Sequence, residues 1–425
     1  MEASYFFQFF RLSRQTFLRV CWLFLVCIFY SNSVVFADVT SENSSVLQAL
    51  EHRIEQLEKE LNRRKTTHLH EKDAAHSDGD FDSYLNHVTF SGFASFGASV
   101  YDAKKGMFLD DNGTTLSATP LTLLGLQMAF EVTENTDFIV QLKAYKSEQE
   151  TIDAEWAYIN HRFNDEWLLR VGAMRLPFFM VSEYMDVGYA QVWANLPTEV
   201  YGGTVDLTFT GANIGYQFNW MQSRHLIQTY AGTHFSTDVD VNIDRISIDK
   251  LMGLRYDVYL QSWRLGLSHT IGEVNADVKS GINESILPKG TEGDFTGIGI
   301  FYEGERFSWL NEWVQQRIDS PYQDEQSFYS SVAYNIQAWT PYLTYAQLKT
   351  TDAEGRRDLS LPPSYSQETI AIGTRYDIYS GFALKLEGLY VIDENNSERI
   401  KRPSSFTADA GKDSILYTLK LDMVF

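Results

Sequence analysis

The chain has 425 residues, with 35 lysines and arginines against 56 aspartates and glutamates, and a net charge of −21. This acidic balance argues against a nucleic-acid partner, because binding phosphate requires clustered cations. The one long uninterrupted apolar run, from Val20 to Tyr30, is roughly half the length of a membrane-spanning helix, which excludes a polytopic helical membrane protein.

The N-terminus predicts export from the cytoplasm. Three arginines precede the apolar run, and Ala37 stands where a signal peptidase reads a small residue. We therefore predict a secretory signal peptide over residues 1–37, with a single-pass membrane anchor as the alternative. Both cysteines, Cys21 and Cys27, lie in this segment, so the mature chain has no thiol for a disulfide, a thiolate metal site or a nucleophile.

A short heptad pattern follows the predicted signal peptide. Apolar residues recur there at alternating spacings of three and four, as in the seam of a coiled coil. They are Leu47, Leu50, Ile54, Leu57 and Leu61. Because so short a helix is marginal alone in water, we predict an oligomeric coiled coil over residues 38–64, with a helix packed on its own chain as the alternative. Residues 65–83 are polar and are predicted to be a linker, whose histidines are too loosely spaced to define a metal site.

From about residue 84 onward the apolar pattern has a period of two, which is the period of β-strands. In the last segment, for example, Leu419, Leu421 and Met423 alternate with Lys420 and Asp422. One apolar and one polar face suit a strand between lipid and an aqueous lumen. About sixteen such segments are predicted, at residues 88–100, 121–132, 136–147, 152–162, 166–175, 204–220, 223–232, 248–260, 262–270, 294–303, 306–317, 327–336, 338–349, 367–377, 381–391 and 415–425.

The connections between these segments alternate in length. Tight turns such as Ser380-Gly381 are followed by long polar loops such as residues 350–366. Short turns at one end and long loops at the other are typical of a transmembrane β-barrel with both termini in the periplasm. The predicted fold is therefore all-β, an antiparallel barrel of about sixteen strands over residues 84–425, preceded by the coiled-coil helix. A soluble β-sandwich is the alternative, but it does not predict the alternation in connection length.

Three stretches carry a family resemblance. Phe425 ends an alternating last strand, residues 87–93 read HVTFSGF, and residues 170–177 read RVGAMRLP. On these stretches the chain resembles bacterial outer-membrane porins. The last strand looks like the signal that the barrel-assembly machinery reads. Residues 87–93 look like the first strand of a porin, and residues 170–177 look like the porin strand that leads into the third loop. The heptad segment is similar to the periplasmic coiled-coil extension of some trimeric porins. The resemblance implies an outer-membrane homotrimer in contact with lipopolysaccharide, with residues 38–64 in the periplasm, where they could meet peptidoglycan.

The longest connection, residues 176–203, occupies the position of the loop that folds into the barrel and narrows it in porins. It is rich in aromatic residues, whose exposure to water is unfavourable, and this favours a constriction loop over an ordinary surface loop. Bases on the polar strand faces opposite acids on this loop would create a transverse field, and charge at the narrowest point sets selectivity. The predicted constriction residues are Arg170, Arg175, Glu183, Asp186, Glu199, Arg264, Arg375, Lys385 and Lys420. The alternative for each is a lumen charge outside the constriction.

Sixteen strands enclose a water-filled lumen, so the predicted function is passive diffusion of small hydrophilic solutes or ions through an outer-membrane porin. Two alternatives stay open, a substrate-selective channel of the anion or phosphate type and a structural or receptor barrel tethered through its periplasmic helix. No enzyme and no cofactor are predicted. His161, His225, His234 and His269 are scattered, and the sequence has neither a Gly-x-Ser-x-Gly elbow nor a metal-binding histidine pair.

Overall fold

A computed structural model describes residues 87–102, 114–117, 121–145, 151–202, 208–237, 243–278, 290–319, 324–352, 366–393 and 414–425. The chain divides into two units, Met1–Leu85 and Asn86–Phe425. The predicted signal peptide, coiled-coil helix and linker (residues 1–37, 38–64 and 65–83) lie outside the described residues. Within the described part of the chain, no helix is both long and apolar enough to cross a membrane.

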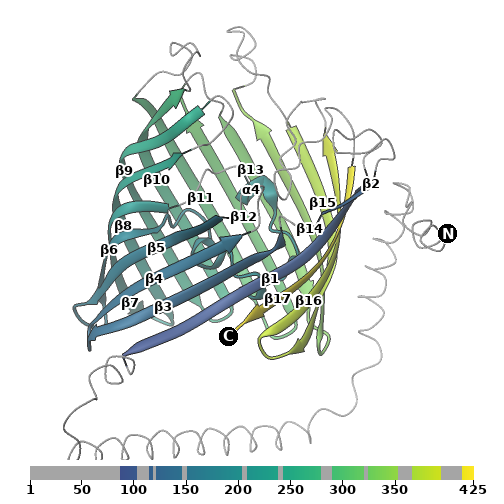
Figure 1. The fold of residues 1–425 in the computed structure, drawn as a ribbon, viewed down its shortest axis with the longest axis horizontal. Helices are drawn as coiled ribbons and strands as arrows, with labels where there is room; N and C mark the ends of the chain where they lie inside the picture. Colours follow the sequence, from purple (N-terminus) through teal and green to yellow (C-terminus); the bar gives the residue numbers. More distant parts are fainter. Residues whose placement is uncertain are drawn as a thin grey trace, which may run out of the picture. The chain divides into compact units, whose positions relative to one another are not determined.

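The second unit is built from antiparallel strands that pair with their neighbours in chain order (Figure 1). The strands are β1 (Val88–Asp102), β2 (Thr114–Ser117), β3 (Leu123–Thr133), β4 (Thr136–Tyr145), β5 (Thr151–Arg162), β6 (Trp167–Arg175), β7 (Thr208–Trp220), β8 (Ser223–Thr237), β9 (Ile243–Leu260), β10 (Trp263–Val278), β11 (Thr291–Glu303), β12 (Phe307–Ile318), β13 (Glu325–Tyr334), β14 (Trp339–Thr350), β15 (Ser366–Tyr379), β16 (Phe382–Asp393) and β17 (Ser414–Val424).

The ring closes through β1, which pairs with β3 along one edge and with β17 along the other. The short strand β2 pairs with the same edge of β1 as β3 does, and it continues the line of β3. Of the 17 strands in the described residues, 16 therefore stand around the ring, because β2 and β3 share one place. The predicted all-β, antiparallel barrel of about sixteen strands is confirmed.

Two details differ from the prediction. Strand β2 lies inside a stretch predicted to be a long loop, since its four residues are too few to show a period. Strands β8, β9 and β10 run several residues beyond their predicted ends, and the register shifts at those ends, between Gly232 and His234 and between Ile271 and Glu273. A β-bulge adds a residue to one strand and inverts the alternation, so a period-two pattern stops there although the strand continues.

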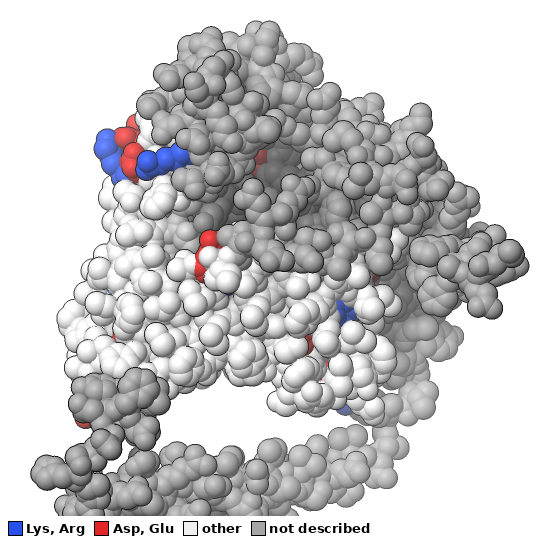
Figure 2. Space-filling view, in the orientation of Figure 1, with Lys and Arg blue, Asp and Glu red and all other residues white. Residues whose placement is uncertain are grey.

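The outward face of the ring is apolar. Leu254, Leu267 and Ile298 are each more than 40% exposed on it. Figure 2 shows that the described wall in view is mostly uncharged, with a group of charged side chains near its upper rim and a few scattered acids and bases below it. Large aromatic residues stand where strands meet the short turns, including Trp167, Trp220, Trp263, Phe307 and Trp339. An apolar band bordered by aromatic residues is the surface that a barrel presents to lipid.

The interior of the ring holds the buried core. Residues 176–202, called the inner loop below, follow β6 and lie inside the ring against the strands of the opposite wall. The inner loop contains two 3₁₀ turns, η5 (Ser182–Tyr184) and η6 (Gly188–Ala190), and the short helix α4 (Thr198–Tyr201). Figure 1 shows α4 within the ring near β13 and β14, which it contacts.

Candidate functional site

The strand register decides which side chains face the interior. Residues directly opposite each other on paired strands share a face of the sheet. Tyr342 and Thr344 of β14 bind the inner loop and so mark the inward face. By this register five of the bases predicted on the strands point inward: Arg170, Arg264, Arg375, Lys385 and Lys420.

The inner loop is packed on the wall formed by β9 to β15 through aromatic rings. Phe178 stacks on Phe295 with ring centroids 4.4 Å apart, and Trp193 meets Tyr329 edge to face at 5.5 Å. Such aromatic pairs contribute roughly 0.5–1.5 kcal/mol beyond the area they bury. This half of the interior is therefore a packed core and not a water-filled space.

Two inward glycines make room for Met180 of the inner loop. A β-carbon built on Gly299 of β11 would overlap the Met180 side chain, and one on Gly266 of β10 would overlap its sulfur. Both residues lack the atom that would prevent this close approach. The loop therefore sits in a socket that the strand sequence leaves open.

Basic residues of the same wall bind the backbone of the inner loop. Arg255 donates to the carbonyl of Phe179 at 2.7 Å, and Arg264 donates to that of Met180 at 2.9 Å. Further round the ring, Arg375 donates to the carbonyl of Gln191 at 3.1 Å. Nearby carboxylates neutralise these bases. Asp257 is within 2.6 Å of Arg255 and 3.1 Å of Arg264, and Asp377 is 2.8 Å from Arg375.

Lys385 of β16 is the most enclosed of the bases, with 0% exposure. Its ammonium donates to the carbonyls of Gly188 and Trp193 at 2.7 and 2.9 Å and is 2.8 Å from the Asp422 carboxylate of β17. Lys420, directly opposite on β17, is 3.4 Å from the same carboxylate but keeps 14% of its side chain exposed.

On the other side of the ring, the inner loop presents acids to bases of β4 and β6. Asp186 lies 2.5 Å from Arg175 and 3.2 Å from Lys143, and Glu155 of β5 binds the same two bases. Burial acts to raise the pKa of the Asp186 carboxyl, but Arg175 and Lys143 together outweigh it and hold that pKa below its usual range. The inner loop is thus held by ion pairs on one side of the ring and by packing and backbone hydrogen bonds on the other.

The most open charges of the predicted set belong to Arg170 and Glu183. They form an ion pair of 2.9 Å, with side-chain exposures of 25% and 60%. The Arg170 guanidinium also lies over the ring of Tyr158 on β5, 5.8 Å from its centroid. Water and solutes in the lumen can therefore reach this pair more easily than the other predicted residues.

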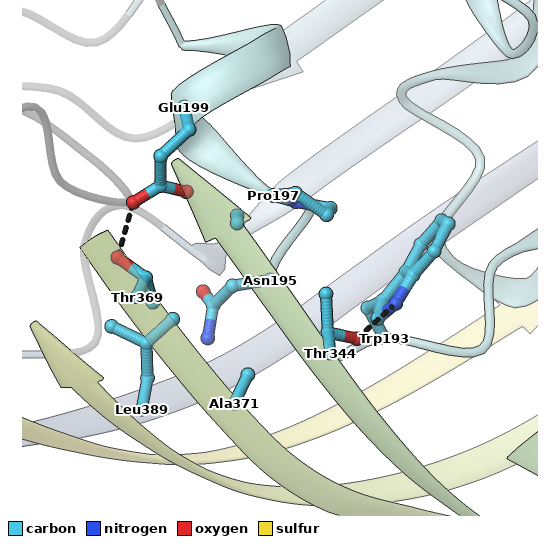
Figure 3. Close-up of a pocket in the computed structure, with 9 residues that line it drawn as sticks. Trp193, Asn195, Pro197, Glu199, Thr344, Thr369, Ala371 and Leu389 are labelled. Carbon is cyan, nitrogen blue, oxygen red and sulfur yellow. Dashed lines mark hydrogen bonds between the residues drawn. The ribbon is translucent and has the colours of Figure 1, made fainter. Parts of the chain in front are cut away.

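Glu199 of α4 faces a different environment. It is 2% exposed and accepts hydrogen bonds from Gln367, at 2.5 Å, and from Thr369, both on β15. Figure 3 shows it beside a small cavity between the inner loop and β14 to β16, which is large enough for about one water molecule. A carboxylate enclosed in this way does not line an open passage, although the sequence grouped it with Glu183 and Asp186.

The inward acids that sequence reasoning missed include Glu155, Asp257, Asp377 and Glu312. The inward direction of two of them could have been predicted, because Asp257 and Asp377 each stand two residues after an arginine on the same strand face. Glu155 was not readable from alternation, because a register shift opposite Gln141 and Leu142 turns it inward. Among the described residues, no group of His, Cys, Asp and Glu is placed to hold a metal ion.

Solved structures with this architecture match the chain at low sequence identity. OmpF of Salmonella typhi, in complex with daunomycin, has a TM-score of 0.54 at 11% identity, over 80% of this chain and 97% of its own. OmpT of Vibrio cholerae, in its trimer form, has a TM-score of 0.52 at 9% identity, over 80% and 99%. The anion-selective porin from Comamonas acidovorans has a TM-score of 0.51 at 12% identity, over 80% and 99%. This chain has the fold of the outer-membrane porins.

No family model matches the sequence of this porin-like barrel, and no curated protein does. The likeness is therefore one of fold, and the chemistry of the interior follows from its own contacts. Those contacts give the barrel an enclosed half, filled by the inner loop against β9 to β17, and a charged edge of the same loop that faces β4 to β6.

Proposed function

We propose that the chain is an outer-membrane porin, a water-filled channel for passive diffusion of small hydrophilic solutes or ions. The observation that supports this best is the combination of a closed ring with an apolar exterior and an interior crossed by a charged loop. A barrel of this strand number is wide enough to enclose water, and the folded-in loop reduces that width without a separate plug domain among the described residues.

In this proposal the inner loop is the constriction, and solutes pass its charged edge beside Arg170 and Glu183. These two residues have the exposure that such a role requires, whereas Lys385 and Glu199 are enclosed. Arg175 and Asp186 would shape the edge, and Arg264, Arg375 and Lys420 would contribute the field of the opposite wall. Because acids pair most of these bases, we propose a weak ion preference, as in a general diffusion pore.

The alternative of an anion-selective channel remains the second candidate. One of the similar structures is an anion-selective porin, and five of the predicted constriction residues are bases on the inward face. The third candidate, a structural or receptor barrel, needs a lumen that passes no solute.

Swelling of liposomes distinguishes these candidates. Vesicles containing the refolded chain are diluted into isotonic solutions of neutral sugars of increasing size. A general pore admits the small sugars, with a rate that falls steeply as the sugar grows. Swelling in small organic anions and none in neutral sugars of the same size would favour the anion channel, and no swelling in either would favour the receptor barrel.

We further propose that the chain is a homotrimer that contacts lipopolysaccharide, with its heptad segment in the periplasm near peptidoglycan. The trimer form of OmpT and the heptads support the oligomer. Recognition by the barrel-assembly machinery would involve Phe425, whose backbone pairs with Gly92 of β1 while its side chain stays 67% exposed.

We also propose that the barrel has no enzymatic activity. His225 is the one histidine in the described residues with a serine partner, since Ser223 Oγ lies 2.8 Å from its Nε2. The same hydroxyl donates to the carbonyl of Trp220 across the β7–β8 turn, and Phe218 and Tyr256 pack against the imidazole. These contacts fit a turn inside the aromatic border. Labelling of Ser223 by a fluorophosphonate would contradict this proposal.

A further inference from the structure

The inner loop lies over the seam where the barrel closes. The first and last strands, β1 and β17, pair from Phe93–Val424 to Asp102–Ile415. The 3₁₀ turn η6 contacts both of these strands. The loop is therefore docked on the part of the wall that forms only when the two ends of the barrel have met.

A chain of buried polar groups joins the seam to the loop. Ser95 of β1 donates to the Asp422 carboxylate of β17 at 2.5 Å, and that carboxylate is 2.8 Å from the Lys385 ammonium. Lys385 in turn donates to the loop carbonyls of Gly188 and Trp193. An ammonium has three protons and no acceptor atom; here it donates to two loop carbonyls, and the Asp422 carboxylate neutralises its charge. Asp422 and Lys385 thus join β1, β16, β17 and the inner loop.

At Gly188 the inner loop lies directly against the seam. A β-carbon on Gly188 would overlap the Asp422 carboxylate and would also meet the Ser95 hydroxyl. Only glycine brings its carbonyl within reach of Lys385 at this place. Asn195, further along the loop, adds hydrogen bonds to Glu387 of β16 and Thr418 of β17 at 2.7 and 2.9 Å.

We propose that Lys385 is a positioning residue that fixes the inner loop on the closing seam, and that it is not a charge met by solutes. Closure of the barrel would then complete the docking site of the loop, so that pore width depends on the pairing of β1 with β17. This inference rests on the proposed role of the inner loop as the constriction. Its physical basis is that removing the ammonium leaves two buried loop carbonyls without this donor and the buried Asp422 carboxylate without its nearest counter-charge, which is costly in a site closed to water.

Lys420 provides a matched control, because it approaches the same carboxylate but is partly exposed, whereas Lys385 is enclosed and donates to two loop carbonyls. The two lysines are directly opposite each other on neighbouring strands and approach the same carboxylate. If both acted only through charge, K385Q and K420Q would change ion selectivity in the same direction. If Lys385 positions the loop, K385Q alone would release it.

The experiment compares single-channel recordings of the wild type, K385Q and K420Q. We expect K385Q to lose the single well-defined conductance level and to show large open-channel noise, whereas K420Q keeps the level and changes only the reversal potential. Equal behaviour of the two variants would overturn the proposal. Heat-dependent migration in SDS gels identifies folded barrels beforehand.

If K385Q does not fold, G188A disturbs the same contact from the loop side. Its control is A190S, on the exposed face of η6. A G188A channel without increased open-channel noise would overturn the proposal.

A second readout separates this proposal from the proposed function. Ala194, next to Trp193, is 2% exposed. A cysteine introduced there, with Cys21 and Cys27 replaced by serine, should react slowly with a maleimide in the wild type and in K420Q, and much faster in K385Q. This result would hold even for a barrel that conducts no ions. Slow labelling in all three proteins would contradict the positioning role.

Discussion

At the residue scale, glycines determine where the inner loop can come close to its neighbours. Met180 enters the space left by Gly266 and Gly299, and the carbonyl of Gly188 reaches Lys385 because no side chain intervenes. The inward glycines Gly266 and Gly299 therefore mark a place where the loop docks.

The Met180 socket can be tested with G299A. The added methyl group overlaps Met180, and overpacking of this kind costs roughly 1–3 kcal/mol. We expect a lower midpoint for denaturant unfolding, together with noisier channels. The control is G215A on the inward face of β7, where the new β-carbon would be 3.7 Å from Leu168. Equal stability of the two variants would show that the socket does not hold the loop.

Asp186 predicts how the loop responds to acid. Because its pKa is held below the usual range, its ion pairs with Arg175 and Lys143 contribute stability above the ordinary aspartate pKa, and this is lost as the pH falls through the lowered value. The ion pairs of Asp186 should thus stay intact from pH 7 down to about 4, so the difference in conductance between the wild type and D186N should persist to about that pH and disappear below it. D186N lacks the ion pairs at every pH and should show the altered conductance already at pH 7. A change in the wild type between pH 7 and 5, absent from D186N, would contradict this assignment.

At the element scale, the sequence predicted the strands well, because lipid on one side and water on the other impose a period of two. Register shifts explain the failures on the longer strands. Bulges in β8, β9 and β10 invert the alternation, and the register shift between β4 and β5 turns Glu155 inward. Side-chain direction on the inner loop has no period at all, so the burial of Glu199 and the exposure of Glu183 depend on tertiary packing that alternation does not encode.

This difference between two acids of one loop is testable. Removing a charge about 4 Å from a passing ion changes its energy by about 1 kcal/mol in a water-like dielectric, which corresponds to roughly a fivefold change in relative permeability. We expect E183Q to shift the reversal potential towards anion permeability by up to this amount. E199Q removes the same formal charge from an enclosed position and should leave the potential nearly unchanged. A larger shift for E199Q than for E183Q, in bilayer recordings under a KCl gradient, would place the passage on the other side of the loop.

At the scale of the whole molecule, the net charge of −21 says little about the pore. The described interior carries bases and acids in pairs, so the sign of its field depends on which pairs remain open to water. Arg170 and Glu183 are the most open and have opposite signs. Global charge therefore does not predict a strong cation preference.

The central claim is that the closed ring is an open channel narrowed by its inner loop. Recording single channels of the refolded chain in a planar bilayer, under a gradient of KCl, tests it most directly. We predict stable conductance steps, in groups of three if the barrel is a trimer, with a reversal potential close to zero. A demonstrably folded barrel that gives no conductance would contradict the claim and leave a sealed receptor or tether as the function.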